Sequence, residues 1–202
     1  MSMILLPFVL ICLLAPGSTT AQQADPQMPT ELPRFQDWIQ LWALPDSTAF
    51  LEFSERGLSA AYRDTVPPGS FPIDSLLVWS PDSTLGVDFL GCNVGLYKGA
   101  LSFGLDDAWN VFLVEPRSGA RTLVLSGGIS LWAQDAEWTS SDTFWIYGRL
   151  VDGHGQCNLS AWRVDLSRSQ VTEFRGPLLD PGGEQIWTDW QALLGDRFPF
   201  LR

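Results

Sequence analysis

Alternation of apolar and polar residues dominates the middle of the chain. The segment 143–151, Thr-Phe-Trp-Ile-Tyr-Gly-Arg-Leu-Val, places successive side chains on opposite faces of an extended strand. Comparable short segments are separated by turn residues at intervals of about 8 to 12, which is typical of an all-β sandwich, barrel or propeller. The pattern predicts strands at 49–54, 58–63, 75–79, 85–90, 96–103, 109–115, 120–125, 143–151, 158–165 and 169–174. We therefore expect an all-β fold built as an antiparallel meander of hairpins.

Both ends of this β-rich region carry aromatic residues at helical spacing. Phe35, Trp38, Ile39 and Trp42 predict a short helix over 33–44. A second helix is predicted over 184–194, which follows a Pro-Gly-Gly turn and ends before a glycine. The aromatic stripes of both segments are interpreted as core packing.

The first residues are typical of a secretory signal. Ile4–Ala15 is apolar but shorter than the roughly 20 residues that cross a bilayer. Small residues before Gln22 predict cleavage after Ala21, with cleavage after Ala24, an uncleaved anchor or a buried core helix as alternatives. We expect a signal peptide at 1–21, a disordered, proline-rich leader at 22–33 and a single β-rich domain at 34–202. The mature protein would then have no stable membrane insertion and would lie in the periplasm or outside the cell.

Net charge limits the partners. The formal charge is −11, and such a surface repels nucleic acid and anionic membranes. Loss of the signal would leave Cys92 and Cys157. In an oxidising compartment such a pair indicates a disulfide, and two buried free thiols or a metal site are the alternatives.

A short motif recurs along the chain. The sequence Pro-Asp-Ser-Thr at 45–48 returns at 81–84, and Ser-Ser-Asp-Thr at 140–143 is similar. Each copy follows a tryptophan, namely Trp42, Trp79 or Trp138. Residues 114–122 and 164–172 also share a hairpin pattern, in which Gly119 is suited to a positive φ.

These residues resemble a known family. The run Trp79–Ser83 (Trp-Ser-Pro-Asp-Ser), followed by Val111–Glu115 and Thr122–Leu125, is similar to the WD40-like repeat of TolB-type β-propellers. The similarity covers about residues 76–176 and extends faintly over 42–75. Two or three units are fewer than the four blades of a closed propeller, so an open stack, a small barrel or a sandwich are alternatives. The resemblance implies a protein-binding platform, and its equivalent loops imply a Cys92–Cys157 bridge.

Candidate binding residues gather around one strand. Trp145, Tyr147 and Arg149 share a face, which is interpreted as core packing, with an exposed platform for a sugar or an aromatic-rich partner as the alternative. Asp152 and His154 follow in an Asp-Gly-His-Gly loop. This loop is interpreted as a solvated turn, with an acid/base pair or weak metal site as the alternative.

Paired carboxylates raise the possibility of glycoside hydrolysis. Asp106 and Asp107 precede Trp109, while Asp135 and Glu137 lie beside Trp138. We interpret them as solvated loop charge, and no nucleophile or phosphate-loop motif accompanies them. We therefore expect no cofactor and no catalytic residue. The expected function is that of an exported, non-enzymatic binding or assembly module for an envelope or extracellular protein or a glycan. A secreted carbohydrate-active hydrolase or sugar-binding protein is the alternative.

Overall fold

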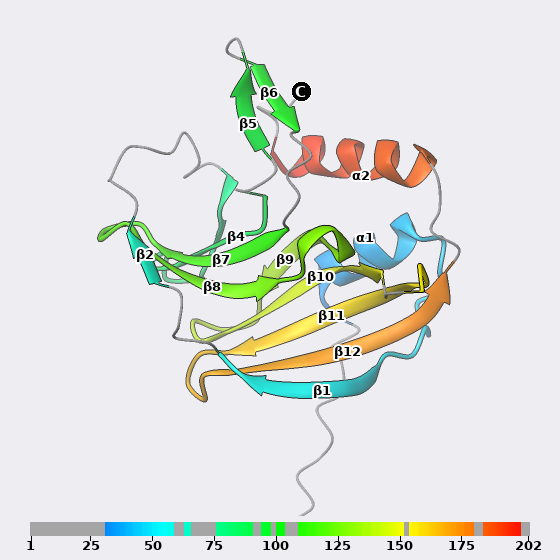
Figure 1. Cartoon of the computed structure of the whole chain (residues 1–202), viewed down its shortest axis with the longest axis horizontal. Coiled ribbons are helices and arrows are strands. Elements are labelled where there is room, and N and C mark those ends of the chain that lie inside the picture. Colours follow the sequence, from blue (N-terminus) through cyan, green and yellow to red (C-terminus); the bar gives the residue numbers. More distant parts are fainter. Residues whose placement is uncertain are drawn as a thin grey trace, which may run out of the picture.

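The computed structural model describes residues 31–58, 63–65, 76–90, 94–97, 100–103, 109–151, 154–179 and 184–198. The predicted signal and most of the predicted leader lie outside these residues. The described residues form two five-stranded antiparallel sheets, a separate two-stranded hairpin and two α-helices (Figure 1). The prediction of an all-β fold with short flanking helices is confirmed. No described helix is both long enough and apolar enough to span a membrane.

Sheet A is a meander of four consecutive strands with one added strand. Its order is β1-β12-β11-β10-β9, and every neighbouring pair is antiparallel. The bounds are β1 Leu51–Gly57, β9 Leu131–Trp138, β10 Thr143–Val151, β11 Cys157–Asp165 and β12 Gln170–Leu179.

Sheet B repeats this plan with shorter strands, in the order β2-β8-β7-β4-β3. The bounds are β2 Arg63–Thr65, β3 Val78–Trp79, β4 Gly86–Asp88, β7 Asn110–Glu115 and β8 Ala120–Ser126. A hairpin of β5 (Val94–Tyr97) and β6 (Ala100–Phe103) is inserted between β4 and β7. The predicted strand 96–103 is therefore two strands.

One segment of chain supplies the outer strand of both sheets. β1 pairs with β12 at the edge of sheet A, and β2, which begins at Arg63, pairs with β8 at the edge of sheet B. Leu51 lies opposite Arg175, so this pairing joins residues from the two ends of the described chain. Neither sheet is complete without the segment 51–65.

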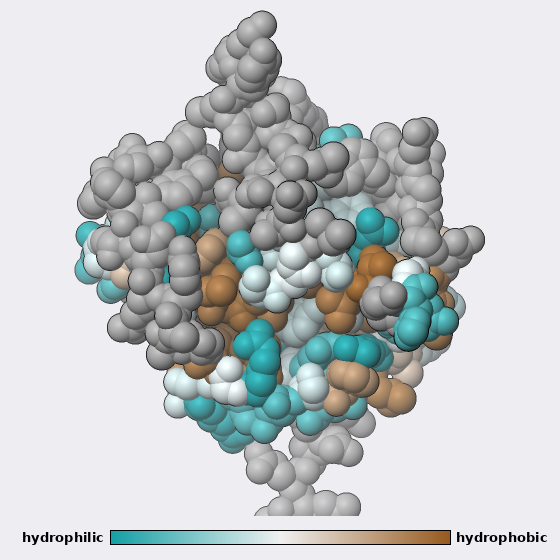
Figure 2. Space-filling model, in the orientation of Figure 1, coloured by the Kyte–Doolittle hydropathy of each residue, from teal (hydrophilic) through white to brown (hydrophobic). Residues whose placement is uncertain are grey.

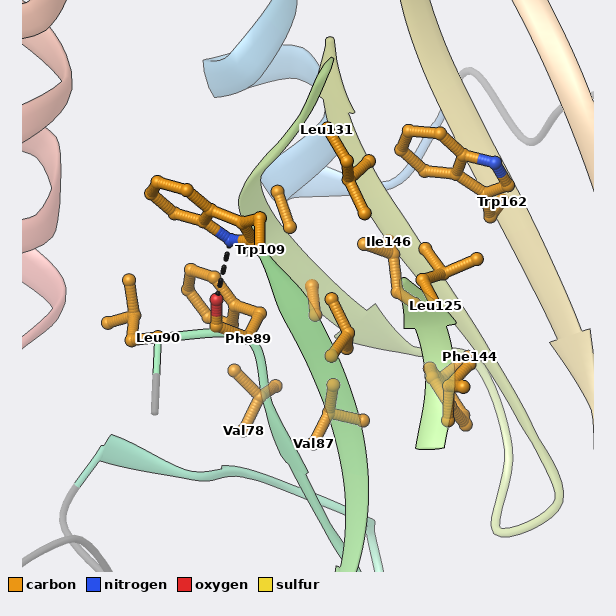
Figure 3. Close-up of a cluster of buried hydrophobic side chains, with 14 of the residues drawn as sticks. Val78, Val87, Phe89, Leu90, Trp109, Leu125, Leu131, Phe144, Ile146 and Trp162 are labelled. Carbon is orange, nitrogen blue, oxygen red and sulfur yellow. Dashed lines mark hydrogen bonds between the residues drawn. The ribbon is translucent and has the colours of Figure 1, made fainter. Parts of the chain in front are cut away.

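The main core lies between the two sheets. Val87 and Val111 of sheet B and Phe144, Ile146 and Val164 of sheet A are fully buried in one cluster. Figure 3 shows this cluster, in which the indole Nε1 of Trp109 donates a 3.0 Å hydrogen bond to the carbonyl of Phe89. Because β10 is covered on both faces, its apolar residues fill both positions of the period-two pattern.

Helix α1 (Pro33–Leu41) covers the opposite face of sheet A, where Phe35, Trp38 and Ile39 are buried. Helix α2 (Glu184–Arg197) packs beside it, and its Trp190 joins the main core against Trp109 and Trp132. Figure 1 shows both helices at the upper right of sheet A. Both predicted helices are confirmed, and both end within three residues of the predicted limit.

The turns between strands contain residues with positive φ and two of the three copies of the repeated motif. Gly119 has φ 71° in the turn between β7 and β8, and Ser169 takes the corresponding positive φ of 52° between β11 and β12. Residues 81–84 and 140–143 connect β3 to β4 and β9 to β10. The copy at 45–48 instead follows α1, so its structural context differs from that of the other two.

Candidate functional site

The predicted platform of β10 is not at the surface. Trp145 and Tyr147 are buried beneath α1, where Trp145 contacts Phe174 and Tyr147 stacks on Trp38 with ring centroids 5.5 Å apart. The two residues do share a strand face, but that face is the one that α1 covers. The interpretation of Trp145 and Tyr147 as core packing is therefore confirmed, and the alternative of an exposed platform is wrong for these two residues.

Arg149 continues the same strand toward the edge of the covered region. Its guanidinium lies over the Trp132 ring at 4.2 Å from the centroid, in a cation–π contact. Burial raises the pKa of the nearby Cys157 thiol, and the positive charge of Arg149 offsets part of that rise. Cys157 is buried with a free thiol. Cys92 lies outside the described residues, so the predicted bridge stays a prediction.

His154 lies in the exposed turn that joins β10 to β11, next to Gly155 with φ 78°. Val151 and Cys157 pair across this connection, so the loop closes a regular hairpin. Asp152 lies outside the described residues. A role for either residue in binding stays a prediction.

Asp135 and Glu137 correct the interpretation as solvated loop charge. Both lie in β9, and the Asp135 side chain is only 1% exposed. Asp135 forms ion pairs with Arg34 of α1, at 3.3 Å, and with Arg197 of α2. Arg197 also reaches Asp37 at 3.2 Å. This polar cluster of Arg34, Asp37, Asp135 and Arg197 therefore fastens both helices to β9, the edge strand of sheet A.

The other predicted carboxylate pair, Asp106 and Asp107, lies outside the described residues. Its interpretation as solvated loop charge stays a prediction.

Glu137 completes the cluster around Asp135 by capping a helix. No side chain of α1 itself caps its N-terminus, and the Glu137 carboxylate accepts the backbone N–H of Arg34 at 3.2 Å. An anion at this position also interacts favourably with the helix dipole. Burial nevertheless raises the pKa of Glu137 above its usual value, and burial also raises the pKa of the adjacent Tyr147 phenol.

A β-bulge allows the neighbouring residues Gln134 and Asp135 both to face the helices. Tyr147 pairs with Asp135 and Gly148 with Ala133, which leaves Gln134 as the extra residue of β9. Its Oε1 accepts hydrogen bonds from Trp38 at 2.9 Å and Trp42 at 3.2 Å. Its carbonyl accepts the Nε1 proton of Trp190 at 2.8 Å.

These contacts define what the polar cluster can do. Asp135 is held by two guanidiniums in the interior, and its side chain is only 1% exposed, so both of its oxygens are engaged by the helices. Glu137 accepts from a helix end rather than facing a second carboxylate across a sugar site. The arrangement is that of a structural clasp between helices and sheet.

A pocket of about 180 Å³ opens between the two sheets, on the far face of sheet A from α1. Leu125 and Leu131 lie on its apolar side together with Leu150 and Trp162, and Arg56 and Glu173 supply charge; Ser126 and Gly127 complete the lining. Figure 3 shows Trp162 beside Leu131 at this end of the core.

Arg56 is fixed at the pocket by a second bulge. Val111 pairs with Leu125 and Phe112 with Leu123, so Val124 is the extra residue of β8. Its carbonyl accepts a hydrogen bond from Arg56 Nη2 at 2.8 Å, which links the edge strand β1 to sheet B.

Beside the pocket, strand β1 leaves large apolar side chains in water. Leu51 is 73% exposed, Phe53 57% and Leu178 of the adjacent β12 60%. Because Phe174 packs beneath α1, its neighbour Arg175 and the opposing Leu51 point to the pocket side of sheet A. We call Leu51, Phe53, Arg175 and Leu178 the β1 surface. Figure 2 shows the lower rim of this face, where β1 runs in Figure 1, as largely hydrophilic with apolar atoms at its right end.

Neither the pocket nor the β1 surface was among the predicted site residues. Leu51 and Phe53 alternate with Glu52 and Ser54, a pattern that normally indicates one buried face. Only the pairing of β1 at the sheet edge shows that this face is uncovered.

Comparison with known proteins found no matching family model, no similar curated protein and no similar solved structure.

Proposed function

We propose that this chain is an exported protein that acts as a non-enzymatic binding module and engages a partner protein through the β1 surface. The observation that carries the proposal is the exposure of Leu51, Phe53 and Leu178 together at the edge of sheet A. Scattered exposed apolar residues are ordinary, but an apolar group on one uncovered sheet face is typical of a protein contact.

Strand β1 adds a second means of association. All seven of its residues are exposed, and among the residues that the structure describes only one of its edges is paired, with β12. The free edge offers backbone N–H and C=O groups to an incoming strand, as in complexes formed by β-strand addition. The guanidinium of Arg175 lies over the Phe53 ring, 3.2 Å from the ring centroid. A contact of this kind restricts the ring before binding, and a restricted side chain loses less entropy when a partner arrives.

The remaining support comes from the sequence. The apolar run Ile4–Ala15 with small residues before Gln22 favours export, so the partner is expected among envelope or extracellular proteins. The resemblance of residues 76–176 to WD40-like repeats also favours protein binding. Among the described residues, Asp135 and Glu137 bind the two helices, so this pair of carboxylates does not support the alternative of a glycosidase.

Site-specific photocrosslinking in the native host tests the proposal. A photoreactive residue at Phe53 is expected to form one discrete adduct with an envelope or extracellular protein. The same residue at Arg117, exposed in the turn between β7 and β8, is the matched control and should give none. The proposal fails if positions 51, 53 and 178 all give no adduct, or if the purified chain hydrolyses a glycan. N-terminal sequencing of the mature protein, expected to begin at Gln22, tests export separately.

A further inference from the structure

The pocket between the sheets combines an apolar interior with a charged mouth. Leu125, Leu131 and Trp162 are at most 4% exposed, so its inner walls are dry side chains of the main core. Its volume of about 180 Å³ is below the roughly 300–1,000 Å³ of sites for drug-sized ligands. A cavity of roughly 150 Å³ is enough for a benzene ring. The pocket therefore fits one apolar group of side-chain size.

The two charged side chains at the mouth, Glu173 and Arg56, differ in their interactions with the rest of the fold. Glu173 is the one carboxylate of the lining, and it is already paired, because Arg175 Nε donates to its Oε1 at 2.6 Å. The hydroxyl of Ser54 donates to its other oxygen at 3.3 Å. Its negative charge is therefore compensated within the fold.

Arg56 keeps a positive charge at the same mouth. A guanidinium carries five N–H donors, and the hydrogen bond to Val124 uses one of them. Among the described residues no ion pair joins Arg56 to Glu173, although both line the pocket. A guanidinium held in place beside an apolar cavity is suited to a carboxylate, which it can bind through two parallel hydrogen bonds.

We propose that this pocket binds a carboxylate that carries an apolar group, with the carboxylate on Arg56 and the apolar group against Leu125, Leu131 and Trp162. Free branched-chain acids and an apolar C-terminal residue of a peptide share this chemistry. The site lies beside the β1 surface but does not require that surface to engage a protein, so either proposal can fail alone.

Calorimetric titration of the purified mature chain with N-acetyl-leucine tests the site. The matched probe is N-acetyl-leucinamide, which keeps the apolar group but lacks the charge. We expect saturable, millimolar or tighter binding of the acid and at least tenfold weaker binding of the amide. Equal affinity for the two probes, or no saturable binding of the acid, overturns the proposal.

Two variants locate the binding. Arg56→Gln is expected to weaken the acid about tenfold or more, while Arg117→Gln, a change of the same kind at an exposed turn, leaves its affinity unchanged. Because Arg56 also holds Val124, Ser126→Phe provides a second test at the exposed rim of the pocket and leaves that hydrogen bond in place. Full binding by folded Ser126→Phe and Arg56→Gln proteins would place the ligand elsewhere.

A four-residue peptide ending in leucine distinguishes the two sources of the carboxylate. If the peptide binds more tightly than N-acetyl-leucine, the ligand is the C-terminus of a chain, and equal affinity identifies a free acid.

Discussion

Arg197 in the last turn of α2 forms an ion pair with Asp135, whose side chain is 1% exposed in the edge strand β9. Arg34 of α1 shares the same carboxylate. One buried anion therefore holds the two helices, which come from opposite ends of the described chain, on a single strand.

Replacement of this anion should be strongly destabilising. Asp135→Asn removes the buried counter-charge of two partly buried guanidiniums and leaves Arg197 only the exposed Asp37, and breaking a buried pair in this way costs about 3–5 kcal/mol. Urea unfolding of the variant measures the loss. Asp46→Asn, at an exposed position after α1, is the control and should change the free energy of unfolding by less than about 0.5 kcal/mol. A similarly small effect at Asp135 would show that the clasp does not stabilise the fold.

Replacement of Gln134 is expected to lower the free energy of unfolding almost as much. Gln134→Leu removes the acceptor of two buried indole N–H groups, those of Trp38 and Trp42. Each unpaired buried donor costs about 1–3 kcal/mol, so we expect a total of about 2–6 kcal/mol for the two. Trp42→Phe in the Gln134→Leu background should recover part of this loss, because it removes one of the stranded donors. Additive losses in the double variant would argue against the shared acceptor.

Glu137 gives the stability a dependence on pH. Burial raises the pKa of Glu137 in the folded protein above its ordinary value of 4.5. The folded state then binds this proton more tightly than the unfolded state, so its contribution favours folding below pH 4.5 and declines as pH rises through the folded pKa.

Comparison with Glu137→Gln isolates this effect. The amide can still accept the N–H of Arg34 but does not titrate, so the variant should lack the decline of stability above pH 4.5. Thermal unfolding of both proteins at a series of pH values, from roughly 4 to roughly 8, measures the difference. Parallel curves for the two proteins would show that Glu137 is not the responsible group.

The two mature cysteines make a separate prediction. If Cys92 and Cys157 are bridged in the exported protein, alkylation before reduction should leave its intact mass unchanged. Reduction should then expose two thiols and lower the stability by about 4 kcal/mol, as the chain-entropy model gives for a loop of this length. Two alkylated cysteines in the oxidised protein would exclude the bridge and agree with the free thiol of Cys157.

Much of the fold could be predicted from local patterns. Phe35, Trp38 and Ile39 fall on one face of α1 because their helical spacing reflects a single buried side. The turn at Gly119 was predictable because that backbone conformation favours glycine. The strand at 143–151 has the predicted bounds because its alternation serves two different cores.

Strand β9 was not predicted, and its residues explain why. Six consecutive side chains from Leu131 to Ala136 are buried, so alternation is lost. Gln134 forms a bulge that shifts the register, and Asp135 is buried only because Arg34 and Arg197 reach it from distant parts of the sequence. The pocket could not be predicted for the same reason, because Arg56 and Val124 are far apart in the sequence and are brought together only by tertiary packing. No local pattern contains these partners.

The pairing of β1 with β12 also sets an order of events during synthesis. Strand β1 has no strand to pair with until β12, in which Arg175 lies opposite Leu51, has been synthesised. A ribosome releases the chain from its N-terminus, so sheet A cannot be completed until almost the whole protein has emerged. Closing so long a loop is slow compared with forming a local hairpin. Sheet A of the nascent protein therefore stays incomplete for most of its translation, whereas all the strands of sheet B are already available once Ser126 has been made.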